Sequence, residues 1–251
     1  MTKAEIRQKV WQTIQREGVA RFPGALGRVP NFAGAEQAAQ LLREMAVWRR
    51  ALVVKVNPDA PQLPVRRLAL AEGKILYMAV PRLRTEKCFV EIDPQRLGKK
   101  AALAASISGA CRWGRAVSPR EMRPVDLVVC GSVAVGRDGA RLGKGGGYCD
   151  LEYGLLREEG KVRESTPILT TVHPPPGGRR ADHHAAARPA RRLPRHPHRG
   201  GRHAPGAPAP ARHLLGPAPA AQDQRHPASP QAHEARRHGD PLAAPAVNGS
   251  R

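Results

Sequence analysis

Residues 125–150, VDLVVCGSVAVGRDGARLGKGGGYCD, contain the two features that decide how this chain folds and where its chemistry lies. The first eleven of them (125–135) form the most apolar strand candidate in the sequence, which is typical of a strand buried in a sheet. Asp138-Gly139 then marks a turn. Four glycines within five positions follow, and the sequence after them predicts a helix over residues 148–158.

Outward from this stretch, short apolar runs alternate with helical patterns. Strands are predicted at 51–56, 74–80, 88–92 and 167–172, and helices at 3–17, 34–45 and 63–72, with a further helical stretch after Pro94. Thr2 and Glu5 form a capping box at the start of the first helix. Such alternation predicts an α/β fold, namely a three-layer, Rossmann-like, mostly parallel sheet with helices on both faces.

The composition changes at about residue 173, which divides the chain into an α/β domain (1–173) and a tail (174–251). The tail has no Lys, Ile, Met, Phe, Tyr or Trp, and it holds 15 of the 25 prolines and nine of the ten histidines. Without aromatic or large β-branched residues it cannot bury enough apolar surface to offset its ordering entropy, so we expect it to be disordered.

The tail's residue set, rich in Arg, Pro, Ala and His, is the one that GC-rich codons specify when they are read out of frame. Our leading hypothesis is a frameshift near codons 173–176, which leaves the α/β domain incomplete at its C-terminal end. A natural, basic, disordered tail is the alternative.

The net charge of +21 raises the question of nucleic-acid binding. Residues 1–173, however, mix acidic and basic side chains along the predicted helices and show no zinc-finger, basic-zipper or RRM-type signature. Of three interpretations of this sequence, a basic nucleic-acid-binding protein is therefore the weakest. Four widely spaced cysteines argue against a zinc site or a disulfide scaffold, and no apolar run approaches the ~18 residues that span a bilayer. We expect a cytoplasmic monomer.

The glycine-rich loop is the strongest candidate for a binding site. Its glycines free the backbone to aim several N–H groups at one phosphate, and Arg141 and Lys144 add positive charge. The carboxylate of Asp150 could hold Mg²⁺ together with waters and phosphate oxygens. The loop is not a P-loop, because Gly145 follows Lys144, and it is not a Rossmann fingerprint, because Tyr148 replaces the last glycine. Composition alone leaves a flexible hairpin equally open.

Three separate motifs resemble those of the 5-formyltetrahydrofolate cyclo-ligase family. RLGKGGGYCD (141–150) is similar to the family signature R-L-G-x-G-x-G-Y-Y-D, and Lys3-x-x-Ile6-Arg7 is similar to its N-terminal K-x-x-L-R. Residues 73–84, GKILYMAVPRLR, resemble its G-K-x-x-x-x-P-R-Y. Together the motifs cover roughly residues 2–173, and the front half also looks like the methenyltetrahydrofolate-synthetase-domain subgroup.

The resemblance implies a function: ATP-dependent cyclisation of 5-formyltetrahydrofolate to 5,10-methenyltetrahydrofolate, with ATP and Mg²⁺ as cofactors and a reduced folate as the substrate. It assigns phosphate binding and catalysis to Arg141 and Lys144, metal binding to Asp150 and folate binding to Asp59, for which a turn-forming role after Asn57-Pro58 is the alternative. The implied nucleotide-binding residues are Lys3, Arg7, Arg141, Gly143, Lys144, Gly145, Gly146, Gly147 and Tyr148.

The sequence also departs from the family pattern. The family's V-P-G-L-A-F-D is replaced at 129–136 by VCGSVAVG, its second Tyr is Cys149, and its Met-x-Met is replaced around residues 87–89. These changes affect the folate pocket more than the phosphate loop. A non-catalytic, nucleotide-binding member of the family is therefore our second interpretation. For His173, the one histidine before the tail, we expect a structural role.

Overall fold

A twisted sheet in the order β4-β3-β2-β1-β5-β8-β9 organises the residues that the computed structural model describes, which are 1–79, 85–136, 138–173 and 186–189. The four central strands are parallel: β2 (Ile75–Ala79), β1 (Val53–Val56), β5 (Leu127–Gly131) and β8 (Ile168–Val172). The outer strands pair antiparallel: β3 (Phe89–Ile92) lies next to β2, and β4 (Arg115–Val117) and β9 (Ala186–Pro189) form the two edges.

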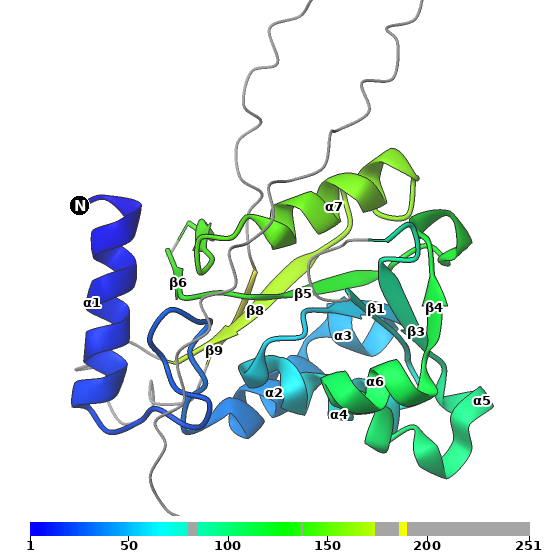
Figure 1. The fold of residues 1–251 in the computed structure, drawn as a ribbon, viewed down its shortest axis with the longest axis horizontal. Helices are drawn as coiled ribbons and strands as arrows, with labels where there is room; N and C mark the ends of the chain where they lie inside the picture. Colours follow the sequence, from blue (N-terminus) through cyan, green and yellow to red (C-terminus); the bar gives the residue numbers. More distant parts are fainter. Residues whose placement is uncertain (80–84, 137, 174–185, 190–251) are drawn as a thin grey trace, which may run out of the picture. The chain divides into compact units, whose positions relative to one another are not determined.

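Helices cover both faces of this sheet (Figure 1). One face carries α2 (Ala35–Glu44), α3 (Ala46–Arg50), α4 (Leu63–Ala71) and α6 (Ile107–Trp113), and the other carries α7 (Tyr148–Glu158). The remaining helices are α1 (Lys3–Arg16), α5 (Pro94–Leu97) and the 3₁₀ turns Ala60–Gln62, Gly98–Lys100, Leu103–Ala105 and Pro119–Glu121. The predicted three-layer α/β architecture is confirmed, with the parallel strands at its centre.

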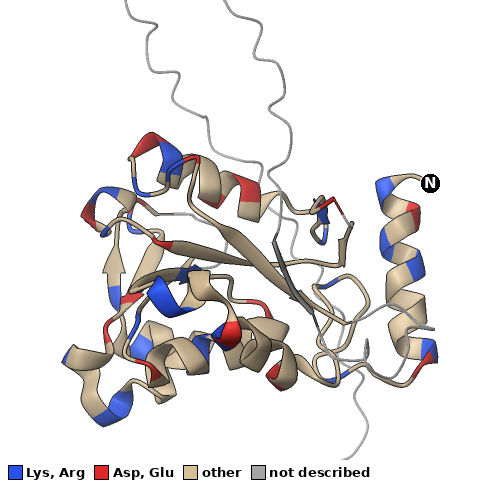
Figure 2. Ribbon diagram, turned by 180° about the vertical axis from the view of Figure 1, so that it is seen from behind, with Lys and Arg blue, Asp and Glu red and all other residues tan. Residues whose placement is uncertain are grey.

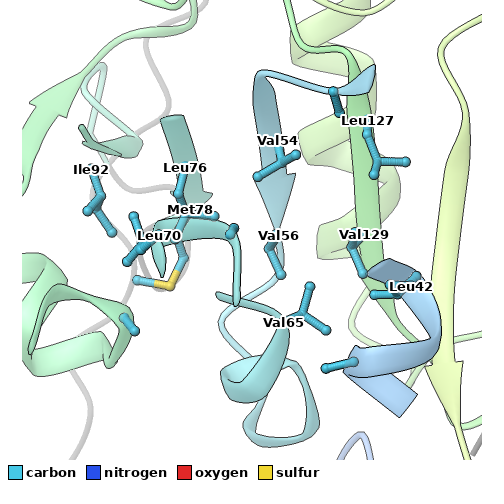
Figure 3. Close-up of a cluster of buried hydrophobic side chains, with 14 of the residues drawn as sticks. Leu42, Val54, Val56, Val65, Leu70, Leu76, Met78, Ile92, Leu127 and Val129 are labelled. Atoms are coloured by element: carbon cyan, nitrogen blue, oxygen red, sulfur yellow. The ribbon is translucent and has the colours of Figure 1, made fainter. Parts of the chain in front are cut away.

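Two apolar cores follow from the alternation of side chains along each strand. In β1, Val54 and Val56 face the core beneath α2 and α4, where they meet Leu127 and Val129 of β5 (Figure 3). Val53 faces the opposite core, beneath α7. Because both faces are covered, β1 and β5 are buried along their whole length and are mostly apolar, as the sequence predicted, with Lys55 of β1 as an exception.

The predicted strand over residues 125–135 is wrong in its second half. β5 ends at Gly131, and Ala134–Val135 form a separate strand, β6, which pairs antiparallel with β7 (Arg141–Leu142). The physical reason is that β5 loses β1 as a neighbour beyond Val129, since β1 ends at Val56 opposite that residue. Among the described strands, only β8 accompanies β5 as far as Gly131. The chain therefore satisfies its backbone within a small hairpin, in which the Val133 N–H donates to the carbonyl of Leu142 at 2.7 Å.

The start of α1 confirms the predicted capping box. The Thr2 N–H donates to Glu5 Oε2 at 2.8 Å, and the Glu5 N–H donates to Thr2 Oγ1 at 3.2 Å. Figure 2 shows acidic and basic residues interspersed along α1, whereas α3, α4, α5 and α6 carry basic but no acidic residues. None of the helices in the described ranges has both the length and the apolar character that crossing a membrane requires.

The tail departs from expectation at four residues. Residues 186–189, predicted to have no secondary structure, form β9, which pairs antiparallel with β8 in the register Thr170 to Arg188. The backbone of β8 thereby gains a partner on its outer edge. The other tail positions, and the Pro81–Arg84 part of the third family motif, lie outside the described residues.

Candidate functional site

The candidate site lies where the strand order of the sheet reverses. β1 lies between β2 and β5. The chain continues from β1 to β2 on one side, whereas the later strands β5 and β8 lie on the other side. In parallel α/β sheets, ligands bind beyond the carboxyl ends of the strands at such a point. A cavity of about 1090 Å³ opens there, next to Asn57 and Asp59 after β1 and Gly131 at the end of β5.

Every residue that the sequence analysis singled out as a site residue lines this cavity. They are Lys3, Arg7, Asp59, Arg141, Gly143, Lys144, Gly145, Gly146, Gly147, Tyr148 and Asp150. The structure thus brings the N-terminal helix, the turn after β1 and the glycine-rich loop, which are far apart in the sequence, to one place. The aromatic ring of Phe22, which is 93% exposed, also borders the cavity.

The glycine-rich loop joins β7 to the N-terminus of α7. Gly145 and Gly147 have φ values of +111° and +69°, in the left-handed region that favours glycine. Gly147 is the N-cap of α7 and has no side chain that could occupy the first N–H groups of this helix. Since Tyr148 and Cys149 line the cavity, the positive end of the helix dipole opens onto it.

The first helix supplies two cations to the loop. Arg7 Nε donates a hydrogen bond to the carbonyl of Gly143 at 2.7 Å. A Cβ on Gly145 would lie 3.6 Å from the guanidinium carbon of Arg7, which places the guanidinium beside this glycine. Lys3 lies one turn earlier on α1 and lines the same cavity. The four-residue spacing puts Lys3 and Arg7 on one face of the helix, and both line the cavity.

Arg141 has a donor to spare. Its side chain is only 8% exposed and forms an ion pair with Asp150, yet its buried Nε has no acceptor among the described residues. Burial lowers the pKa of Arg141, but Cys149, Cys130 and Asp150 raise it by more, so the net shift is upward and the side chain stays charged. A buried N–H without a partner is costly, which points to an acceptor supplied by a ligand.

Lys144 and Asp59 face each other across the cavity wall. Lys144 Nζ lies 3.4 Å from Asp59 Oδ1, and the two side chains are 46% and 16% exposed. The buried guanidinium of Arg66 fixes the turn that carries Asp59, because its Nη1 donates to the carbonyls of Asn57 at 2.6 Å and Asp59 at 3.1 Å. Burial lowers the pKa of Arg66 to about 10. Sequence reasoning missed Arg66, which reads as one more charged residue of a surface helix.

A buried ion pair lies behind the loop. Lys55 of β1 and Glu152 of α7, 2% and 5% exposed, are in direct contact, and Lys55 Nζ also donates to Asn57 Oδ1 at 3.1 Å. Burial lowers the pKa of Lys55, but the charge of Glu152 and the two neighbouring cysteines raise it by more, so the net shift is upward. Sequence reasoning missed this pair, although a lone lysine inside the apolar run VVKV was its signal.

Two thiols meet where the first turn of α7 lies against β5. Cys149 Sγ lies 3.0 Å from Cys130 Sγ and 3.8 Å from Asn57 Oδ1. In the neutral pair either thiol can donate, but once Cys149 ionises the Cys130 thiol is the donor. This hydrogen bond, together with Lys55 and Arg141, lowers the pKa of Cys149 to about 7. The same hydrogen bond and burial raise the pKa of Cys130.

The described residues include no group of three or more His, Cys, Asp or Glu side chains that could hold a metal by themselves. Asp150 offers a single carboxylate, of which Oδ1 contacts Arg141. That fits Mg²⁺ only in the form in which waters and substrate phosphates supply most of the ligands. His173 packs edge-on against the ring of Phe32, with centroids 5.8 Å apart.

Comparison with known proteins gives a consistent result. Residues 1–174 match the 5-formyltetrahydrofolate cyclo-ligase family. The chain is 39% identical over 176 residues to a methenyltetrahydrofolate synthase domain-containing protein of Bos taurus, covering 69% of this chain and 46% of that protein. Proteins of the same name are 41% identical in Mus musculus (69% and 47% covered) and 39% in Danio rerio (68% and 46%).

The chain therefore spans about half the length of the curated relatives it matches. The match to the family, by contrast, covers the whole α/β domain and every lining residue named above. The chain belongs to the 5-formyltetrahydrofolate cyclo-ligase family.

Proposed function

We propose that the cavity binds Mg-ATP and a reduced folate, and that the chain converts 5-formyltetrahydrofolate to 5,10-methenyltetrahydrofolate with release of ADP and phosphate. The observation that carries the proposal is the buried Nε of Arg141, which lacks an acceptor among the described residues in a cavity that Lys3, Arg7 and Lys144 also line. Four cations around a glycine-rich loop suit a polyphosphate.

In this proposal the phosphates lie against residues 143–147 and the N-terminus of α7. Arg141 would donate its free N–H to a phosphate oxygen, and Lys3, Arg7 and Lys144 would balance the remaining charge. Asp150 would hold Mg²⁺, whose charge neutralises phosphate oxygens during transfer. Positioning and charge stabilisation of this kind are the main contributions that proteins make to phosphoryl transfer.

The size of the cavity supports two ligands. A single small-molecule site is usually ~300–1,000 Å³, and this cavity of about 1090 Å³ lies above that range. Asp59 and the exposed Phe22 border this cavity and offer a carboxylate for N–H groups and a face for a flat ring. The formyl oxygen would attack the γ-phosphate, and N10 would then close the ring as phosphate leaves.

Nucleotide binding without turnover is the second candidate. It is favoured by the contact of Asp59 with Lys144, which engages the carboxylate assigned to folate, and by the loss of the family's Pro, Phe and Asp at residues 129–136. In this case the phosphate site is kept and the folate half of the cavity is not used for catalysis.

The test is a turnover assay with the full chain, 5-formyltetrahydrofolate and Mg-ATP, in which ADP and the cyclised product are both measured. We expect equal amounts of the two with the wild type and with Arg16→Ala, and loss of both with Arg141→Ala. ATP binding without product would support the second candidate. Absence of ATP binding by the folded wild type would overturn both.

A further inference from the structure

The thiols of Cys130 and Cys149 are a feature that the proposed reaction does not use. Their sulfur atoms lie 3.0 Å apart, although one belongs to the central strand β5 and the other to the first turn of α7, 19 residues later. Cys130 is 1% exposed, whereas Cys149 is partly exposed and lines the cavity. Small oxidants that enter the cavity can therefore reach one sulfur and not the other.

From this geometry we infer that Cys130 and Cys149 are a reversible oxidation site, at which a hydroperoxide converts the two thiols to an intramolecular disulfide. A disulfide bond is ~2.0 Å long, so the sulfurs need to approach by about 1 Å. Part of that approach falls on the glycine-rich loop, because Cys149 lies just after Gly147. The other two cysteines do not compete for this disulfide, because they lie elsewhere in the fold. Cys111 is exposed on α6, and Cys88 is buried next to β3.

The chemistry balances with one hydroperoxide. The sulfur of Cys149 attacks a peroxide oxygen, the O–O bond breaks, and the thiol proton leaves with the departing oxygen as water or an alcohol. The sulfur of Cys130 then attacks the resulting sulfenic acid, the S–O bond breaks, and water leaves with the proton of Cys130. The two sulfurs lose two electrons in total, and a small dithiol restores them by exchange.

The site also gives oxidation a readout at the cavity, a part of the inference that rests on the proposed function. The side chain of Cys149 forms part of the wall beside Arg141 and Asp150, so a ligand that fills the cavity should cover its sulfur. Bound Mg-ATP is therefore expected to slow the reaction of Cys149 with peroxide. The disulfide draws Cys149, which lines the cavity, towards Cys130, so the disulfide form should bind Mg-ATP with an altered affinity.

The experiment treats the full chain with hydrogen peroxide, unfolds it in denaturant, blocks the remaining thiols with an alkylating agent, and maps the cysteines by peptide mass spectrometry. We expect a Cys130–Cys149 cross-linked peptide, alkylated Cys88 and Cys111, and full reversal by dithiothreitol. Cys111→Ser is the matched control and should give the same cross-link. Cys130→Ser should instead leave a sulfenic acid on Cys149 that dimedone traps.

Any of three results would overturn the inference: oxidation confined to Cys111, disulfides only between two copies of the chain, or an unreacted Cys130–Cys149 pair. If Cys130→Ser does not fold, the wild type alone decides between these outcomes. Adding Mg-ATP separates the two proposals. A cross-link that forms at the same rate with and without Mg-ATP keeps the oxidation site and counts against the nucleotide site. Slower oxidation in Mg-ATP supports both.

Discussion

Arg7 Nε on the first helix donates a hydrogen bond to the backbone carbonyl of Gly143, 2.7 Å away and 136 residues later in the sequence. This bond makes α1 a part of the glycine-rich site. The helix also contacts β6 of the short β6–β7 hairpin and the loop that follows α1 in the sequence. The guanidinium of Arg7 is thereby held beside the loop.

We expect Arg7→Ala to weaken Mg-ATP binding about tenfold, since a charge-assisted contact to phosphate is worth ~1.5–3 kcal/mol and one factor of ten is about 1.4 kcal/mol. Arg16→Ala is the matched control, because Arg16 belongs to the same helix, is exposed and does not line the cavity. Calorimetric titration measures both. Equal losses in the two variants would mean that α1 acts through its overall charge and not through this contact.

The buried pair of Lys55 and Glu152 predicts a strong asymmetry between single and double substitutions. Glu152→Ala leaves the ammonium of Lys55 buried without its carboxylate and should lower the free energy of unfolding by about 3–5 kcal/mol. The double variant Lys55→Met/Glu152→Leu removes both charges and should recover most of this loss. Urea unfolding measures the effect, with exposed Glu158→Ala as the control on the same helix. A double variant as unstable as Glu152→Ala would contradict the prediction.

Tyr77 predicts an alkaline limit to stability. Its buried hydroxyl donates to Glu91 Oε2 at 2.6 Å and accepts from the Arg123 N–H at 3.0 Å, and burial raises the pKa of Tyr77 to about 12. Because the folded pKa lies above the ordinary value of about 10, the stabilisation is complete below pH 10 and is lost as the pH rises towards 12.

The measurement is urea unfolding of the wild type and Tyr77→Phe at pH 9 and pH 11. At pH 9 the variant should be less stable by about 1–3 kcal/mol, because Glu91 and Arg123 lose their buried partner. At pH 11 the gap should be smaller. Tyr148→Phe, with an exposed ring, is the control. A gap that is the same at both pH values would show that the hydroxyl of Tyr77 does not titrate in this window.

The pairing of β9 with β8 changes what truncation of the tail should do. If the whole tail were disordered, as its composition predicts, removing residues 174–251 would cost almost no stability. Since residues 186–189 pair with β8, a chain ending at His173 should instead lose roughly 1–3 kcal/mol, the contribution of a few net backbone hydrogen bonds. A chain ending at His198 keeps β9 and is the control. Thermal unfolding of the two truncated chains tests this prediction, together with a chain in which the tail is read in the other frame. Equal stability of the two truncated chains would contradict the prediction.

The parts of this fold that were predictable are those with a local signal. The helix over residues 148–158 and the capping box of Thr2 and Glu5 are set by nearby residues, and both are found as predicted. Most of the residues proposed for the site were suggested by spaced motifs, and the structure brings the proposed residues to one cavity. β6, β9 and the contacts of Arg66 and Lys55 depend on which distant segment lies alongside, and no local pattern specifies that.

The central claim is that the cavity around the glycine-rich loop binds the phosphates of ATP. Its most direct test is calorimetric titration of Mg-ATP into the full-length wild type, Arg141→Ala and Arg16→Ala, each shown to be folded by circular dichroism. We expect the wild type and Arg16→Ala to bind alike and Arg141→Ala to bind at least tenfold more weakly, because the variant removes the buried donor that lacks an acceptor among the described residues. Wild-type affinity in Arg141→Ala would contradict it.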